Sequence, residues 1–159
     1  MDGSRLFVQA NARNGLGLYP RDACERDEVL LPLHRVHSIS ANPRCWPAEP
    51  GVCLRSPSDL HALIQHACVP TAYVDWNVSV LRALRRLSEG DEITVNWLTI
   101  FDAIATPFQC RCGSLHCMGL ISGFCLLPLE EKLKLELYLS PYLKRLLNDD
   151  ASAARARAG

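Results

Sequence analysis

Three cysteines near the middle of the chain have a spacing that is typical of a metal site. Cys110, Cys112 and Cys117 fall within eight residues. Thiolates are ligands for zinc, and a structural zinc ion takes four ligands in a tetrahedron with sulfur about 2.3 Å from the metal. A fourth ligand must therefore come from elsewhere in the chain. The best candidate is Cys68, in the stretch Gln-His-Ala-Cys-Val-Pro.

Other short motifs precede this cysteine-rich segment. Residues 15–19 read Gly-Leu-Gly-Leu-Tyr, and residues 90–97 read Gly-Asp-Glu-Ile-Thr-Val-Asn-Trp. Paired glycines allow the backbone to bend sharply and to approach a ligand closely. Taken alone, Gly-x-Gly equally fits an ordinary hairpin. The sequence has no third glycine and no helix pattern after it, which argues against a dinucleotide-binding fingerprint.

Taken together and in this order, the motifs resemble those of SET-domain methyltransferases over residues 5–125. Residues 65–71 are similar to the family signature Asn-His-Ser-Cys-x-Pro-Asn, and residues 90–97 to the strand Gly-Glu-Glu-Leu-Thr-x-Asp-Tyr. Residues 108–123 resemble the post-SET segment, Cys-x-Cys-x4-Cys. The resemblance implies a mainly β fold of small curved sheets, with the signature segment threaded through a loop as a pseudoknot. Threading of this kind cannot be derived from sequence pattern, because ordinary topology rules forbid it.

The resemblance also divides the chain and implies a metal and a cofactor. We expect a SET-like domain over residues 1–106, a post-SET zinc segment over 107–125, and a C-terminal helical extension with a tail over 126–159. In post-SET proteins the signature cysteine shares one zinc ion with the three post-SET cysteines, which implies the ligand set Cys68, Cys110, Cys112 and Cys117. The cofactor that the resemblance implies is S-adenosylmethionine.

Several residues are expected at the cofactor by motif position. Gln65 and His66 would meet its amino-acid end, although His66 could also be a core histidine bonded to the backbone. The residues expected to contact the rest of the cofactor are Leu16, Gly17 and Leu18 through their main chain, and Phe108 and Cys112 over the adenine.

Three positions depart from the family pattern. Trp97 stands where active SET enzymes usually carry a tyrosine whose hydroxyl orients the amine; an indole N–H can donate a hydrogen bond but cannot accept one. Gln65 replaces one asparagine, and Thr71 replaces a second that in the family ties the knot together. Because a displacement of about 1 Å is enough to damage a reaction that depends on alignment, we expect both replacements to disturb the site. The candidate catalytic residues are therefore Trp97 and His66. We expect methyl transfer to a lysine amine of a protein or peptide. The alternatives are a catalytically impaired zinc-binding interaction module and a small zinc-ribbon adaptor without a cofactor pocket.

Composition and charge bear on the partners. The 159-residue chain has no net charge and a pI near 6.9, which argues against general binding to nucleic-acid backbones or to anionic membranes. The chain has no run of about 18 apolar residues, and its N-terminus lacks a signal-peptide core. We expect an intracellular protein, nuclear or cytoplasmic. The four remaining cysteines, Cys24, Cys45, Cys53 and Cys125, are expected to be free thiols.

Residue patterns indicate short strands before residue 125 and helices after it. Residues 28–33 are expected to form an edge strand because they contain Pro32. Residues 40–58 contain four prolines and are expected to lack regular structure. The other expected elements are strands at 6–10, 16–18 and 93–97, a hairpin of 72–76 and 78–84, a helical turn at 58–66 capped by Ser58 or Asp59, helices at 128–139 and 141–148, and a frayed tail at 149–159. The C-terminal leucines are expected to pack on the domain or, alternatively, to face a partner.

Overall fold

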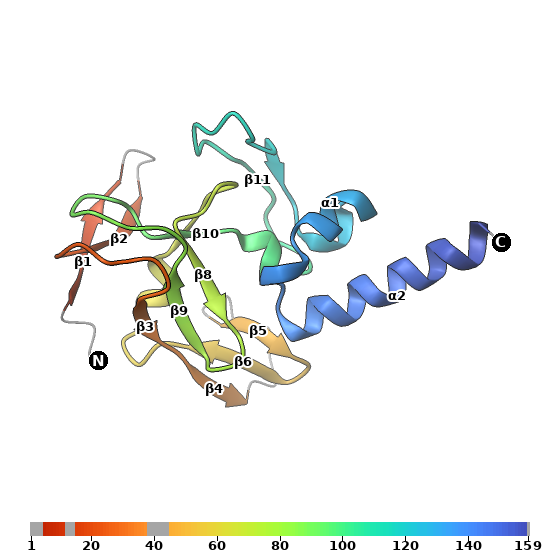
Figure 1. Ribbon diagram of the computed structural model, residues 1–159, viewed down its shortest axis with the longest axis horizontal. Helices are drawn as coiled ribbons and strands as arrows, with labels where there is room; N and C mark the ends of the chain where they lie inside the picture. The colour runs from red at the N-terminus through yellow and green to blue at the C-terminus, as the bar shows by residue number, and fades with distance from the viewer. Residues whose placement is uncertain (1–4, 12–14, 38–44, 159) are drawn as a thin grey trace.

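The computed structural model describes residues 5–11, 15–37 and 45–158, and these form several small sheets followed by helices (Figure 1). The strands are β1 Leu6–Ala10, β2 Leu16–Pro20, β3 Val29–Pro32, β4 His34–His37, β5 Trp46–Glu49, β6 Val52–Arg55, β7 Gln65–His66, β8 Ala72–Asp75, β9 Val80–Ala83, β10 Thr94–Val95, β11 Phe108–Gln109 and β12 Leu120–Ile121. The helices are α1 Leu129–Lys134 and α2 Pro141–Ala158, with 3₁₀ turns η2 Leu60–Leu63, η3 Trp97–Thr99, η4 Phe124–Leu126 and η5 Glu136–Tyr138.

The sheets are small and mostly antiparallel, which confirms the expected mainly β fold. The strand orders are β1-β2, β4-β6-β5, β3-β9-β8 and β11-β12, all with antiparallel neighbours. One short pair is parallel: β7 aligns with β10, so that Gln65 lies opposite Thr94 and His66 opposite Val95. This pair joins the signature segment to the 90–97 segment, where the resemblance places the pseudoknot.

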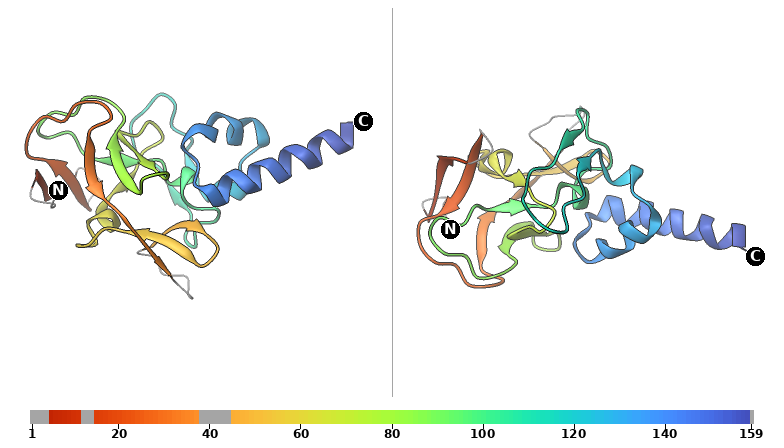
Figure 2. Two further views of the ribbon diagram at one scale, coloured as in Figure 1. Left: turned by 60° about the horizontal axis from the view of Figure 1, so that its bottom comes forward. Right: turned by 90° about the horizontal axis from the view of Figure 1, so that it is seen from above.

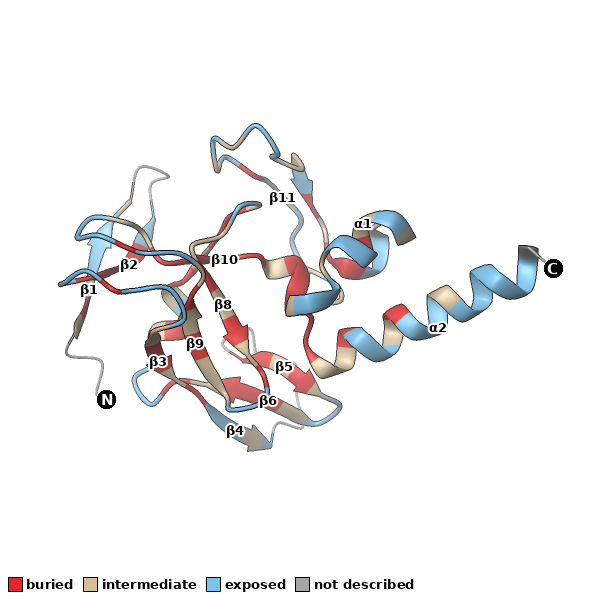
Figure 3. Ribbon diagram, in the orientation of Figure 1, coloured by how far each residue is buried: buried red, intermediate tan, exposed pale blue. Residues whose placement is uncertain are grey.

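Hydrophobic residues from the β1 to β10 sheets fill one continuous core (Figure 3). Leu18, Leu54, Leu81 and Ile93 are fully buried there. Burial of apolar surface of this kind is the main favourable term in folding. The alternation of buried and half-buried residues in β8 and β9 follows the period of two of a β-strand.

Proline marks sheet edges in this fold. Pro32 lies in β3, an edge strand of β3-β9-β8, as expected. Pro47 lies in β5, an edge strand of β4-β6-β5. An edge position tolerates proline because no neighbouring strand needs its missing N–H. The expectation that residues 40–58 lack regular structure is therefore wrong for β5 and β6, while residues 40–44 lie outside the described ranges.

Two of the cysteines expected to be free are paired. Cys45 and Cys53 form a disulfide across the β5–β6 hairpin, with their Cα atoms 5.6 Å apart. The expectation of free thiols is wrong for this pair, because hairpin pairing brings together two residues that are eight positions apart. Cys24 is a buried free thiol and Cys125 is an exposed one.

The helical turn before the signature segment forms without the expected cap. Asp59 precedes η2 in the left-handed region, at φ 54°, and its side chain makes no capping hydrogen bond. Its carboxylate instead accepts two hydrogen bonds of 2.8 Å and one of 3.1 Å from the guanidinium of Arg55. Asp59 thus stands at the predicted N-cap position, but its carboxylate is engaged by this stronger ionic partner and does not cap the turn.

The second C-terminal helix extends further than expected, whereas the expected helix at 128–139 is divided into α1 and η5. Ser140 caps α2 as predicted: its Oγ accepts the N–H of Leu143 at 3.2 Å, and Pro141 follows at the first helical position. Figures 1 and 2 show α2 projecting away from the sheets. The expected frayed tail is wrong, because α2 continues to Ala158. The alanines and arginines of this segment favour helix. Within the described ranges, no helix is both long enough and apolar enough to cross a bilayer.

The C-terminal leucines divide between core and surface. Leu139, Leu143 and Leu147 are buried and pack around Phe124. Leu137 is 76% exposed and Leu133 is 48% exposed. Packing against the domain is thus confirmed for the first group of leucines.

Candidate metal centre and adjoining cavities

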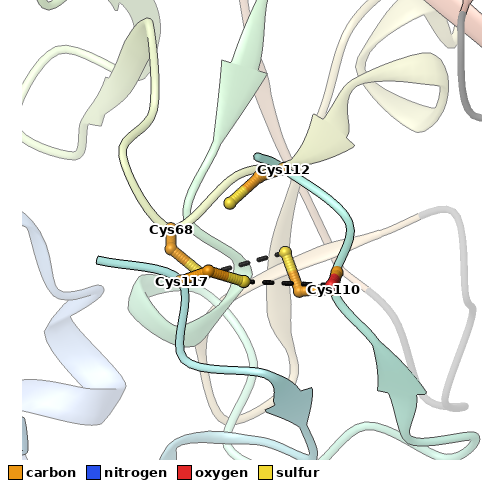
Figure 4. Close-up of side chains that lie close together, drawn as sticks. All are labelled: Cys68, Cys110, Cys112 and Cys117. Atoms are coloured by element: carbon orange, nitrogen blue, oxygen red, sulfur yellow. Dashed lines mark hydrogen bonds between the residues drawn. The ribbon is translucent and has the colours of Figure 1, made fainter. Parts of the chain in front are cut away.

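Four cysteine side chains converge from two distant parts of the chain (Figure 4). The sulfur atoms of Cys68, Cys110, Cys112 and Cys117 all lie within 4.8 Å of one another. Two sulfurs on one tetrahedral zinc ion, each about 2.3 Å from the metal, are about 3.8 Å apart. The sulfurs of Cys68 and Cys110 lie 3.8 Å apart. The predicted ligand set is therefore assembled, and its geometry fits zinc.

The pKa values of these thiols indicate which of them would lose a proton when a metal ion binds. Burial raises the pKa of Cys68 to about 12. Burial also opposes ionisation of Cys112, but main-chain hydrogen bonds, including one from Ser114, lower its pKa to about 6. At neutral pH the metal-free cluster would thus hold thiols and thiolate together. A divalent ion would displace the remaining protons, because the thiolate is the form that ligates.

His66 lies between this cluster and Trp97. It is 4% exposed. Its Nδ1 accepts the main-chain N–H of Trp97 at 3.1 Å, and its Nε2 is 3.4 Å from the sulfur of Cys68. Since Nδ1 acts as an acceptor, the proton of the neutral ring resides on Nε2, which donates toward the sulfur. The backbone-bonded histidine considered from sequence is therefore present, and contact of His66 with a cofactor stays a prediction.

A cavity of about 230 Å³ adjoins the metal centre and gathers three of the seven residues expected at the cofactor, Gln65, His66 and Phe108. Its walls include Gln65, His66, Phe108 and Trp97. The rings of Trp97 and Phe108 meet edge to face with centroids 5.4 Å apart. These residues come from three separate stretches of the chain, brought together by the β7–β10 pair and by β11. The cavity also takes in Gln109, Cys110 and Arg111.

The glycine segment reaches this region through a hydrogen bond. Nε2 of Gln65 donates to the main-chain oxygen of Leu16 at 3.0 Å. The side chain of Leu16 is 51% exposed, whereas Leu18 is fully buried. Gly17 faces Glu92, whose carboxylate would lie 2.5 Å from a Cβ at that position. Leu16, Gly17, Leu18 and Cys112 are not among the residues that line the 230 Å³ cavity.

A second, larger cavity lies beyond Trp97. It measures about 610 Å³. Its mostly apolar walls are formed by Trp46, Ile64, Trp97, Phe101 and Ile104, with His61 and Glu49 among the polar residues. Of the described residues, Trp97 alone lines both cavities. Its indole N–H donates to the main-chain oxygen of Ile64 at 3.3 Å, which fixes the ring between them.

The sequence reasoning missed most of this second cavity. Trp46 and Glu49 belong to β5, within the segment expected to be irregular, and His61 belongs to η2. Arg111 and Gln109 were also missed in the first cavity. Gln109 and Arg111 could have been found from their position in the sequence, because they lie next to the predicted residues Phe108, Cys110 and Cys112. No comparable motif marked the second cavity.

Thr71 replaces the asparagine expected to tie the two segments together, and it makes that connection with a hydroxyl. Its Oγ1 donates to the main-chain oxygen of Glu92 at 2.8 Å and accepts the N–H of Thr94 at 2.8 Å. Its own N–H donates to Oγ1 of Thr94 at 3.1 Å. The substitution that appeared disruptive in sequence is thus compensated by a side chain of different length.

We therefore expect Thr71→Val to lower the free energy of unfolding by about 1–3 kcal/mol, because it leaves partly buried main-chain groups without their partner. Chemical denaturation followed by circular dichroism measures this change. Thr71→Ser keeps the hydroxyl and serves as the matched control. A loss in Thr71→Ser without a loss in Thr71→Val would show that the methyl group, and not the hydroxyl, stabilises the connection.

Comparisons with known proteins agree with this architecture. No family model matches the chain. The chain is 34% identical over 141 residues to Methyltransferase flvH of Aspergillus flavus, an alignment covering 82% of this chain and 78% of that protein. Solved structures with the same fold include KRYPTONITE in complex with mCHH DNA, an H3(1-15) peptide and SAH, with a TM-score of 0.58, 18% identity and 72% of this chain covered.

Two further solved structures support the same fold. The methyltransferase domain of the human histone-lysine N-methyltransferase SETMAR has a TM-score of 0.53 at 13% identity, covering 74% of this chain and 58% of that one. Arabidopsis thaliana SUVH6 in complex with SAM has a TM-score of 0.56 at 11% identity, covering 72% of this chain and 32% of that one. The match to KRYPTONITE spans 29% of the KRYPTONITE chain. The chain belongs to the family of SET-domain methyltransferases.

Proposed function

We propose that the protein transfers a methyl group from S-adenosylmethionine to an amine, and that the acceptor is a lysine side chain of a protein or peptide. The observation that supports this most directly is the pair of cavities that meet at Trp97 beside the cysteine cluster. Solved structures of the same fold contain SAM or SAH, and one also contains a histone H3 peptide. The smaller cavity is proposed to hold the cofactor and the larger one the acceptor.

When bound, the cofactor supplies a methyl group on a positively charged sulfur, and transfer is a direct displacement. The protein's part in such a reaction is alignment and exclusion of water. On the cofactor side, Phe108 would form an apolar wall, and His66 would form a wall that its two hydrogen bonds hold in place. On the acceptor side, Phe101, Ile64 and Ile104 would surround the methylenes of a lysine. An apolar wall disfavours the charged ammonium, which lowers the pKa of the lysine amine and favours its nucleophilic form.

The metal would act structurally in this arrangement. Zinc held by Cys68, Cys110, Cys112 and Cys117 would join the signature segment to residues 107–125. We also propose the division into residues 1–106, 107–125 and 126–159. Three clusters of buried residues follow this division in outline: one fills the β1 to β10 sheets, one joins Leu98 to Cys110 and Ile121, and one joins Phe124 to the C-terminal leucines. The second and third clusters each span one of the proposed boundaries.

Partners and compartment follow from charge and from the cysteines. With no net charge, the chain is proposed to act on a protein and not to bind nucleic acid or membrane directly. The KRYPTONITE structure that contains DNA is of a longer chain, and the match spans only 29% of it. The thiolate cluster supports a reducing compartment, nuclear or cytoplasmic. The Cys45–Cys53 pair is the opposing observation, and a free-thiol count on freshly purified protein decides between them.

Calorimetric titration with S-adenosylmethionine tests the cofactor proposal. We expect saturable binding that weakens about tenfold in Phe108→Ala, since a packed aromatic ring contributes on the order of 1–1.5 kcal/mol beyond its area. Phe101→Ala is the matched control, because Phe101 lines the acceptor cavity and should leave cofactor affinity unchanged. Absence of heat and of any thermal shift would contradict the proposal and favour a zinc-ribbon adaptor.

A methyl-transfer assay tests the acceptor. The protein is incubated with S-adenosylmethionine labelled in the methyl group and with a protein extract, and we expect label on lysine after acid hydrolysis. Phe101→Ala should reduce labelling while cofactor binding persists. A catalytically impaired module is not favoured, because the curated relative is a methyltransferase and both cavities are present. Binding of the cofactor without any labelled product would revive that alternative.

A further inference from the structure

We infer that His66 is a positioning residue through which the metal centre fixes Trp97. The imidazole has one nitrogen directed at each of them. Nδ1 accepts the main-chain N–H of Trp97 at 3.1 Å, while Nε2 is 3.4 Å from the sulfur of Cys68. Because a neutral imidazole carries one proton, accepting at Nδ1 requires donation at Nε2. The two hydrogen bonds are therefore linked through a single tautomer.

A metal ion would strengthen one end of this link. A thiol sulfur can act as a donor or as a weak acceptor, whereas a metal-bound thiolate can only accept. The sulfur of Cys68 already has a second main-chain donor, the N–H of Met118 at 3.3 Å. Hydrogen bonds to an ionised acceptor are roughly twice as strong as neutral ones. Ion binding would thus hold the Nε2 proton toward Cys68 and leave Nδ1 as an acceptor for Trp97.

The other end of the link is at the boundary between the two cavities. Trp97 opens η3, so that its N–H has no partner within that turn and is held by His66 instead. Its indole is held separately by Ile64. The rings of His66 and Phe108 meet edge to face at 5.8 Å, and those of Trp97 and Phe108 at 5.4 Å. A change in the tilt of His66 would therefore move two walls of the smaller cavity together.

This role differs from that of an ordinary buried histidine. A packing residue would affect stability alone, whereas a positioning residue transmits a change at the metal to Trp97. The inference rests on the zinc assignment and on the place of Trp97 in the proposed transfer site. Its tests require neither cofactor nor methyl transfer, so they can fail while the proposed function holds, or succeed while it fails.

Two substitutions separate the two hydrogen bonds. The amide nitrogen of glutamine reaches roughly as far as Nε2, so His66→Gln keeps a donor toward Cys68 and loses the acceptor for Trp97. The amide oxygen of asparagine lies near the place of Nδ1, so His66→Asn keeps the acceptor and loses the donor. We expect His66→Asn to weaken zinc binding 10- to 100-fold, the usual effect of losing a partner behind a metal ligand. His66→Gln should stay within a few-fold of the parent. Equal zinc affinities in His66→Asn and the parent would overturn the inference.

The effect on Trp97 is read by ¹⁹F NMR of protein labelled with 5-fluorotryptophan. The chain has three tryptophans, Trp46, Trp76 and Trp97, and Trp97→Phe assigns the third signal. Exchanging zinc for cadmium lengthens the metal–sulfur bonds and keeps the protein folded. We expect the Trp97 signal to move on exchange while the other two stay, and this response to disappear in His66→Gln. An unchanged response in that variant, or no response in the parent, would overturn the inference.

A measurement on the unsubstituted protein covers the case in which the variants do not fold. Loading with ¹¹³Cd allows scalar coupling between the metal and a proton hydrogen-bonded to a ligand sulfur. We expect coupling to the Nε2 proton of His66, together with ¹⁵N shifts of a ring protonated at Nε2. A ring protonated at Nδ1 would overturn the inference, because that tautomer cannot accept the N–H of Trp97.

Discussion

Replacing Cys68 by serine is expected to remove most of the bound zinc and to destabilise the fold as severely as Cys112→Ser does. A structural zinc ion contributes on the order of 10 kcal/mol to folding, which is comparable with the whole stability of a typical domain. The sulfur of Cys68 lies 3.8 Å from that of Cys110 although the residues are 42 positions apart. Losing it would release residues 107–125 from the signature segment.

Metal analysis of the purified variants measures the zinc content, and thermal unfolding measures the stability. Cys125→Ser is the matched control, since Cys125 is an exposed free thiol outside the cluster. It should keep the zinc content and the melting temperature of the parent. Full zinc retention in Cys68→Ser would remove this residue from the ligand set.

Replacing Trp97 by tyrosine is expected to raise the rate of methyl transfer by about 100-fold. One positioned donor at a reacting centre is commonly worth about this factor or more. In the parent, the indole N–H is already engaged with the main-chain oxygen of Ile64 at 3.3 Å, so Trp97 offers no hydroxyl and no uncommitted N–H to an amine. A tyrosine at this place could orient the amine through its hydroxyl.

Initial rates with labelled S-adenosylmethionine measure this effect, with the substrate identified by the extract assay. Trp97→Phe is the matched control: it also makes room but supplies no hydroxyl. A gain in Trp97→Tyr alone assigns the limitation to the missing hydroxyl. Equal gains in both variants would assign it to the bulk of the indole. A loss in Trp97→Tyr would show that the parent uses the indole itself to shape the site.

The parts of the structure that were predictable carry local signals. Pro32 indicated an edge strand because proline lacks an N–H, and Ser140-Pro141 indicated a helix start because both residues favour that position. The cysteine spacing indicated a metal. The family resemblance supplied Cys68 as the fourth ligand, and the structure places its sulfur beside the other three.

The rest depended on contacts that are distant in sequence. Residues 46–55 contain Pro47 and Pro50 yet form a hairpin, because sheet pairing with β4 and the disulfide outweigh local preference. The larger cavity is built mainly from β5, β6, η2 and residues 101–106, which share no motif. Thr71 appeared to break the connection that it makes, since pattern matching compares side-chain names and not the main-chain groups within their reach.

The position of Trp97 has a consequence for ligand design. Its ring is held through Ile64 and its main chain through His66, so a single compound joining both cavities would have to displace a side chain that is anchored twice. Separate fragments, one for each side, avoid that cost. Fragment screening should accordingly yield two independent families of hits, and linking them should bring little gain in affinity unless residue 97 is first made smaller.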